Sequence, residues 1–324
     1  MKHEMAWKML ESPREDYCEI FVNLVTPFLQ FRRKIELGGE ALVLLVKDVR
    51  LDLPRVMKIA HYNLSEIAKK RFIRSVKVLS KLRSHYFPSV LFLSEEDSPL
   101  FVLLDWTPGK TLRELVNMRE NSLSRSINIL FELCKAVELL HNNDIIHRDI
   151  KPENILVNGQ VKLIDFGLSK SQQDENLTQV EYALGTRKYS SPEQIQDAVN
   201  VDARTDICSL GRIFYYLMTS LETFEPEHLK SKKEIDFFRA ATAPALTDRT
   251  KSVQEFRLGL EELFDLQEVK SEKKAYDKLD AFEDIFFILE GSRQRIKYYT
   301  LLSDDDITRL KIACLERRIQ CFSD

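Results

Sequence analysis

One short stretch of the chain, residues 145–167, carries polar side chains whose types and spacing suit chemistry on a phosphate group. Asp149 is a carboxylate that can accept or orient the proton of an attacking hydroxyl, and Lys151 can place positive charge at a transferring phosphoryl group. Asn154 and Asp165 offer the oxygen ligands that magnesium prefers. These residues predict phosphoryl transfer, which depends on positioning, a carboxylate near the attacking hydroxyl and divalent metal ions.

The local pattern predicts a hairpin that holds these side chains on loops. Short apolar runs at 155–157 and 161–164 flank Asn158-Gly159, a dipeptide typical of tight hairpin turns. Gly167 gives the backbone freedom close to the second metal-ligand candidate. A rigid scaffold can aim side chains on such loops at a ligand.

The hydrophobic periodicity changes along the chain from strands to helices. From about residue 31 to 60, apolar and β-branched runs alternate with polar turns, as they do in strands. Residues 64–83 carry apolar positions at helical spacing, and the chain beyond Pro108-Gly109 is largely helical. We therefore expect an α+β fold with a small β-rich N-terminal lobe and a larger helical C-terminal lobe.

The runs HRDIKPEN at 147–154 and DFG at 165–167 resemble the catalytic and metal-binding loops of eukaryotic-type (Hanks-type) Ser/Thr protein kinases. Tyrosine kinases usually lack a lysine at the place of Lys151. The resemblance implies the bilobal kinase fold, ATP and Mg²⁺ as cofactors with Mn²⁺ as an alternative metal, and protein substrates bearing Ser or Thr. Several motif forms are similar to those of bacterial or phage-borne members. Asp149 and Lys151 are then the catalytic residues.

The resemblance also implies a nucleotide site in the N-terminal lobe. Lys58, in the run VMKI, resembles the strand lysine that contacts the α- and β-phosphates. Leu104 resembles the gatekeeper of the hinge that binds adenine through backbone groups. The other positions that the resemblance places around ATP are Leu37, Gly38, Gly39, Leu45, Asp105 and Thr107.

Further positions resemble the activation segment of these kinases, which a phosphate can order by charge-assisted bonds to a cationic pocket. Arg148 and Lys170 stand where the pocket cations are expected. Counting forward from the DFG aspartate favours Thr178 as phosphate acceptor, whereas counting back from the end of the segment favours Tyr182. An alternative is that the segment is ordered without phosphate.

The end of that segment, residues 185–193, resembles its counterpart in the kinase family. Thr186 is implied to bridge the base and the lysine of the catalytic loop. The resemblance also pairs Glu193 with Arg249 as a structural ion pair, and it makes Asp206 the buried helix aspartate that anchors the backbone of the catalytic loop.

Two regions depart from the family pattern. Beyond the glycine pair, Glu40 and Val43 stand where further phosphate-binding glycines are expected, and side chains there would crowd the approach to the phosphates. In the amphipathic helix, Ser75 stands where the glutamate partner of Lys58 belongs. Glu40 is one candidate for that missing acid. We therefore predict a non-specific Ser/Thr protein kinase, with a pseudokinase or nucleotide-gated interaction module as the alternative and a small-molecule kinase third.

Composition narrows the class of protein. The chain has 324 residues, is 44% hydrophobic and 31% charged, and suits a globular protein. A net charge of −3 implies no strong attraction to nucleic acid or to an anionic membrane. Five cysteines without metal-ligand spacing predict reduced thiols, and no apolar stretch approaches the roughly 20 residues that span a bilayer. We expect a cytoplasmic protein without a nucleic-acid partner; a secreted effector acting in a host cytoplasm is the alternative.

The pattern divides the chain into three parts. Residues 1–30 are expected to form an N-terminal helical extension, and residues 31–265 a kinase domain with an N-lobe at 31–105 and a C-lobe at 109–265. Residues 266–324 are expected to form a helical tail that packs on the large lobe, dimerises or binds a partner.

Overall fold

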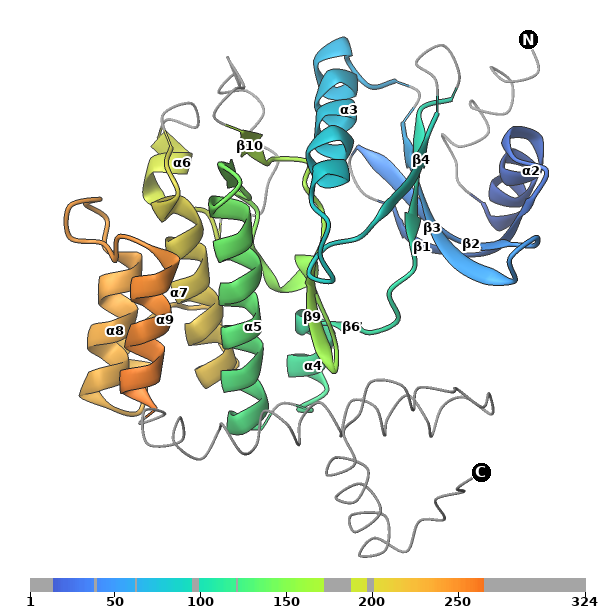
Figure 1. The fold of residues 1–324 in the computed structure, drawn as a ribbon. Helices are drawn as coiled ribbons and strands as arrows, with labels where there is room; N and C mark the ends of the chain where they lie inside the picture. Colours follow the sequence, from blue (N-terminus) through green and yellow to red (C-terminus); the bar gives the residue numbers. More distant parts are fainter. Residues whose placement is uncertain are drawn as a thin grey trace, which may run out of the picture. The chain divides into compact units, whose positions relative to one another are not determined.

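The computed structural model describes residues 14–37, 40–61, 63–94, 99–120, 122–171, 188–196 and 201–264. The chain divides into two compact units, Met1–Leu260 and Glu261–Asp324; the elements that follow lie in the first, except that the last helix continues to Leu263. It has the predicted α+β arrangement, with a five-stranded sheet followed by a mainly helical part (Figure 1). The predicted helices of the tail lie outside the described residues.

The sheet is antiparallel throughout, with the strand order β1-β2-β3-β5-β4. Its strands are β1 (Leu29–Leu37), β2 (Ala41–Asp48), β3 (Leu53–Ala60), β4 (Val90–Leu93) and β5 (Phe101–Asp105). Because successive side chains in a strand point to opposite faces, the apolar residues of β2 and β3 form two layers.

Helix α2 (Glu15–Val25) packs on one face of this sheet (Figure 1). Phe21 and Val22 of the helix are fully buried in the same cluster as Leu44 and Met57 of the strands. Helix α3 (Glu66–Lys81) corresponds to the predicted amphipathic helix, and Ser65 caps its first turn by accepting a bond from the main-chain nitrogen of Ala68 at 3.2 Å.

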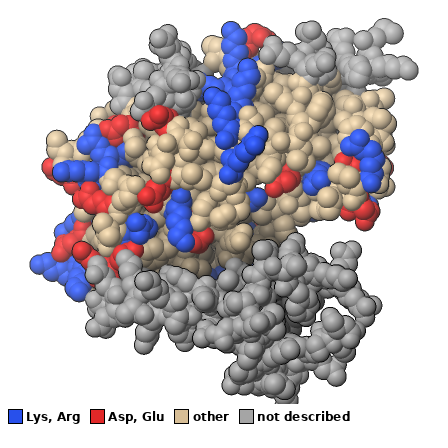
Figure 2. All heavy atoms as spheres, viewed as in Figure 1, with Lys and Arg blue, Asp and Glu red and all other residues tan. Residues whose placement is uncertain are grey.

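The two sides of α3 differ sharply in polarity. Phe72 and Val76 pack against a second apolar cluster of the sheet. The exposed side carries basic residues, and Figure 2 shows Lys and Arg side chains gathered over this helix; Lys70, Lys77 and Lys81 are among its exposed positions. Burial of the apolar stripe therefore accounts for the helix's place beside the sheet.

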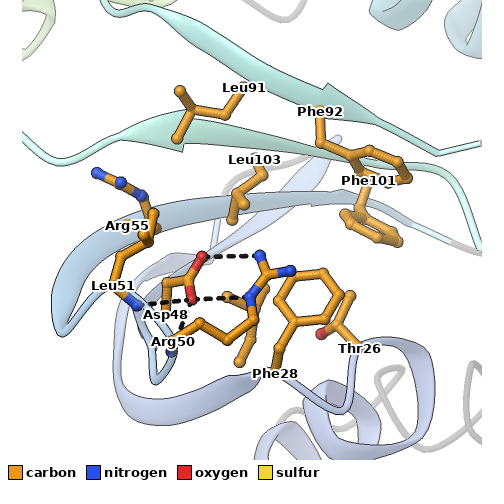
Figure 3. Close-up of a pocket in the computed structure, with 11 residues that line it drawn as sticks. Thr26, Phe28, Asp48, Arg50, Leu51, Arg55, Leu91, Phe92, Phe101 and Leu103 are labelled. Atoms are coloured by element: carbon orange, nitrogen blue, oxygen red, sulfur yellow. Dashed lines mark hydrogen bonds and ion pairs between the residues drawn. The ribbon is translucent and has the colours of Figure 1, made fainter.

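A cavity of about 280 Å³ opens on the face of the sheet that carries α2 (Figure 3). At its edge the buried carboxylate of Asp48 accepts bonds from the Nε and NH2 groups of Arg50, at 3.3 and 3.0 Å. The Arg50 guanidinium lies 3.8 Å from the centre of the Phe28 ring. Met57 and Ile59 of β3 point to the face of the sheet that carries this cavity. Because Lys58 lies between them in the strand, its side chain points to the opposite face, so the cavity is separate from the predicted nucleotide site.

The C-terminal part is built around helix α7, most of whose residues are buried. Its helices are α4 (Leu112–Asn117), α5 (Leu123–His141), α6 (Pro192–Gln196), α7 (Arg204–Thr219), α8 (Lys232–Thr242) and α9 (Val253–Leu263), with the short turns η1 (Pro152–Asn154) and η3 (Pro226–His228). Its strands are β6 (Lys110–Thr111), β7 (Ile145–Ile146), β8 (Ile155–Asn158), β9 (Gln160–Leu163) and β10 (Lys170–Ser171). Gly159 has a φ of +70° between β8 and β9, as the predicted hairpin requires. Among the helices of the described ranges, none is long and apolar enough to cross a bilayer.

Candidate active site

Asp206 of α7 holds the backbone of the catalytic loop. Its side chain is fully buried, and its two carboxylate oxygens accept bonds from the main-chain nitrogens of His147, at 2.9 Å, and Arg148, at 2.8 Å. Nε2 of His141 lies 2.8 Å from the same carboxylate. Burial alone would raise the pKa of Asp206, but these hydrogen bonds lower it below its usual value. The loop conformation is therefore tied to a rigid buried helix.

Asp149 lies at the centre of the loop with two polar partners. Lys151 donates from Nζ to Asp149 Oδ2 at 2.8 Å, and Asn154 donates from Nδ2 to the same oxygen at 2.8 Å. Burial raises the pKa of Asp149 to about 6, against the opposing effects of Lys151 and Asn154. A carboxylate with this pKa is largely ionised at neutral pH and is a stronger base than an ordinary aspartate.

Asp165 adopts a left-handed backbone, with a φ of +62°, and contacts the other lobe. Its Oδ1 atom accepts a bond from Nζ of Lys58 at 2.8 Å and one from the main-chain nitrogen of Gly167 at 3.2 Å. Lys58 is the main reason that the pKa of Asp165 falls to about 2. The next residue, Phe166, is buried, with its ring centroid 4.9 Å from that of His147. Asp165 is therefore a permanent anion at the junction of the two lobes.

Asn154 and Asp165 provide oxygen donors that fit a divalent cation. The amide nitrogen of Asn154 donates to the main-chain and carboxylate oxygens of Asp149, each at 2.8 Å, so its carbonyl oxygen is the atom left for a metal. Within the described ranges, no group of three or more His, Cys, Asp or Glu side chains forms a complete metal site. Two protein oxygens suit magnesium, which usually completes its coordination with waters and substrate phosphates.

An apolar surface lies next to Lys58 on the inner face of the sheet. Val43 and Leu45 of β2 stand opposite Lys58 and Val56 of β3, and Val56 stands opposite Leu104 of β5. All four apolar side chains of this set are half-buried, whereas their neighbours on the other face are buried. Val56 was not among the sequence-predicted nucleotide contacts, although alternation along β3 places it on the same side as Lys58.

The predicted hinge follows β5 directly. Asp105 Oδ1 accepts a bond from the main-chain nitrogen of Ser89 at 2.6 Å, and Oδ2 lies 3.4 Å from Nζ of Lys162. Thr107, two residues later, is half-buried. The side chain of Asp105 thus connects the hinge to the segment before β4 and to the β8–β9 hairpin, which fixes the hinge from both lobes.

The hypothesis that Glu40 replaces the missing helix glutamate is wrong. Glu40 forms an ion pair with Arg71 of α3, and Lys58 pairs instead with Asp165 at 2.8 Å. Ser75 donates its hydroxyl to the main-chain oxygen of Phe72 at 2.7 Å, within its own helix. Arg71 is a buried cation one helical turn before Ser75, and it attracts the loop carboxylate that was one candidate partner for Lys58.

The predicted activation segment is only partly described. Arg148 is buried, with a φ of +69°, and its main-chain oxygen accepts a bond from Nε2 of Gln194 at 2.9 Å. Lys170 pairs through its backbone with Ile146, beside the catalytic loop. Leu37 is described only as the last residue of β1. The remaining predicted residues lie outside the described ranges: Gly38, Gly39, Thr178, Tyr182 and Thr186.

Glu193 and Arg249 form the implied ion pair, and it is bidentate. The NH1 and NH2 groups of Arg249 donate to the two carboxylate oxygens of Glu193 at 2.6 and 2.9 Å. The Arg249 side chain is fully buried, and Thr205 donates its hydroxyl to Glu193 at 2.9 Å. This pair connects α6 to the loop that precedes α9.

Comparison with known proteins agrees with this geometry. The protein kinase domain model matches residues 29–279, so the chain belongs to the protein kinase family. It is 28% identical over 286 residues to the serine/threonine-protein kinase PrkC of Bacillus subtilis, covering 86% of this chain and 43% of PrkC. It is 34% identical over 196 residues to PknL of Mycobacterium bovis, covering 59% of this chain and 49% of PknL. It is 31% identical over 198 residues to PknB of Mycobacterium tuberculosis, covering 58% of this chain and 32% of PknB. The chain thus spans less than half the length of these curated relatives.

Proposed function

We propose that the chain is an ATP-dependent Ser/Thr protein kinase that transfers the γ-phosphoryl group of ATP to a hydroxyl of a protein substrate. The observation that carries this proposal is the convergence of a base and a phosphate-facing lysine, Asp149 and Lys151, with the pair of Lys58 and Asp165. The family membership and the names of the relatives support it. Enzymes of this kind act mainly by positioning and by electrostatic stabilisation.

In this proposal Asp149 accepts the proton of the substrate hydroxyl, and Lys151 stabilises the charge that develops on the transferring phosphoryl group. Lys58 orients the α- and β-phosphates. Asn154 and Asp165 would hold Mg²⁺ or Mn²⁺, which neutralises phosphate charge when bound. The half-buried face of β2, β3 and β5 is the surface that we assign to adenine, since it lies on the same side of the sheet as Lys58.

We also propose where the kinase domain begins and ends, how its activation segment is ordered, and in which compartment it acts. We place the kinase domain at residues 31–265, with a helical extension before it and a tail from 266 to 324 that contacts a partner or a second copy. Arg148 and Lys170 would receive a phosphate on Thr178 or Tyr182. We propose a cytoplasmic enzyme of the non-specific Ser/Thr type.

Transfer of label from γ-labelled ATP tests this function directly. Purified protein with Mg²⁺ is expected to label Ser or Thr of a generic protein substrate, and Asp149→Asn is expected to lower the rate by about 10²–10⁴ because the base is lost. Asp236→Asn, at an exposed position on α8, is the matched control and should leave the rate unchanged. Nucleotide binding without transfer by the wild type would instead support the pseudokinase alternative.

A further inference from the structure

A cluster of charged side chains lies beside the catalytic loop and takes no part in the chemistry described so far. Arg113 of α4 donates from Nε to Glu153 Oε1 at 2.8 Å and from NH2 to Glu222 Oε1 at 2.6 Å. Its NH1 group lies 3.4 Å from the Tyr216 hydroxyl, and its guanidinium carbon lies 5.1 Å from the centre of that ring. One arginine thus bridges a carboxylate of the catalytic loop and a carboxylate that follows α7.

The same cluster holds the segment that leads into α6. Glu222 accepts a bond from the hydroxyl of Tyr189 at 2.8 Å and lies 3.5 Å from Nζ of Lys188. The Tyr189 ring packs edge-on against Phe224, with the centroids 5.4 Å apart. Arg113 therefore lies between the catalytic loop and residues 188–189, with contacts to both sides through the two glutamates.

This position is within reach of a bound substrate. Glu153 belongs to η1 and precedes Asn154, whose side chain donates to Asp149 at 2.8 Å. An extended peptide rises about 3.3 Å per residue, so residues two or three places from an acceptor hydroxyl at Asp149 reach this neighbourhood. The side chains of Glu153 and Arg113 are 44% and 24% exposed, so a substrate side chain can approach them.

Arg113 offsets one of the two carboxylate charges of the cluster, and Lys188 lies 3.5 Å from Glu222. Burial lowers the pKa of Arg113, but its hydrogen bonds to Glu222 and Glu153 outweigh that effect and raise the pKa overall. The hydrogen bond from Arg113 is also the main reason that the pKa of Glu222 is lowered. Both shifts favour the charged forms of Arg113 and Glu222. Two carboxylates without the arginine would attract a lysine or arginine of a substrate through charge-assisted bonds.

We propose that Arg113 is a specificity-determining residue that takes the place of a substrate's basic side chain between Glu153 and Glu222. The enzyme then phosphorylates Ser or Thr sites whose flanking residues are neutral or acidic, since a basic residue finds this place already filled. This inference rests on the proposed kinase function and adds the class of substrate sequence to it.

A peptide series tests the proposal. One Ser-containing peptide carries glutamine at every flanking position, and its relatives carry a single arginine at each position in turn, up to four residues from the acceptor. The wild type is expected to show a kcat/KM ratio, arginine peptide to glutamine peptide, at or below one. Arg113→Met is expected to raise that ratio about tenfold at one or more positions, the effect of one charge-assisted hydrogen bond.

Two further variants make the result specific. The double variant Arg113→Met/Glu222→Gln also removes one of the two carboxylates that lost their arginine partner. Most of the increase in the kcat/KM ratio seen with Arg113→Met alone should then disappear. Arg239→Met, at a 61% exposed arginine of α8, should leave the ratio unchanged.

Three outcomes overturn the inference. One is a wild type that already prefers arginine severalfold at these positions, and another is a folded Arg113→Met protein with an unchanged ratio. If circular dichroism shows Arg113→Met to be unfolded, Arg113→Gln replaces it, because glutamine removes the positive charge but keeps a polar side chain; an unchanged ratio there also counts against the inference. The third outcome, no transfer by the wild type to any peptide, overturns the proposed function as well, whereas transfer with unchanged ratios overturns only the role of Arg113.

Discussion

The catalytic loop and the nucleotide-facing strands hold their key side chains in different ways. In the loop, Asp149 is bonded to Lys151 and Asn154, which are close neighbours in the sequence, and Asp206 anchors the backbone from a buried helix. All four residues belong to one lobe. Their geometry is therefore set by packing within that lobe and does not depend on its position relative to the sheet.

In the nucleotide-facing strands, by contrast, the main charged contact reaches across to the other lobe. Lys58 has its ion-pair partner in the other lobe, at Asp165, and α3 carries Ser75 where the family places a glutamate. The acid of the nearby loop, Glu40, pairs with Arg71. The position of Lys58 thus depends on the approach of the two lobes. The difference teaches that the side chains around Asp149 are held by contacts within one lobe, whereas the contact of Lys58 joins the two lobes.

Loss of the loop anchor should have the largest effect. Asp206→Asn replaces an acceptor of three hydrogen bonds with an amide whose nitrogen cannot accept one from the loop backbone. We expect the free energy of unfolding to fall by about 3 kcal/mol, because a buried N–H is left unsatisfied. Urea unfolding measures this loss, and kcat should fall about 100-fold as Asp149 loses its position. Stability and kcat like those of the wild type would contradict the contrast drawn between the two regions.

The pH dependence of activity should be the next largest effect. The pKa of Asp149 is raised to about 6 from its usual 3.8, so kcat/KM should fall about tenfold for each pH unit below 6 as the base is protonated. Because of the same shift, the folded state binds this proton more tightly than the unfolded chain does. As the pH falls from 6 to 4, Asp149 therefore raises the free energy of unfolding while activity is lost. Asp165, with a pKa of about 2, stays ionised throughout. Initial rates from pH 5 to 8, with fluorescence as a control for folding, test this; a flat profile would argue against Asp149 as base.

A change in the nucleotide-facing region should have the smallest effect. Ser75→Glu would give Lys58 a partner within its own lobe, and we expect the KM for ATP to fall about threefold, as suits a half-exposed ion pair. Glu40→Gln is the control and should change the KM less than twofold, since Glu40 pairs with Arg71 and not with Lys58. Steady-state rates at varied ATP measure both. A larger change in KM for Glu40→Gln than for Ser75→Glu would contradict this expectation, because it would make Glu40 the acid that acts on Lys58.

Much of the fold follows from local patterns in the sequence. Asn158-Gly159 predicts the β8–β9 hairpin because few other residues tolerate its left-handed turn, and the apolar spacing over 64–83 predicts α3. Alternation along β3 is also sufficient to place Val56 on the same face as Lys58. These features depend on near neighbours, which is why sequence reasoning succeeds there.

The sequence by itself determined the catalytic residues that we propose, since HRDIKPEN and DFG carry them as compact motifs. Only the tertiary structure decided which charges pair across long separations. Lys58 meets Asp165 107 residues later, and Arg113 meets Glu222 109 residues later. Such pairs are chosen by burial and by the distance between charges in the folded chain, and neither quantity can be read from spacing along the sequence.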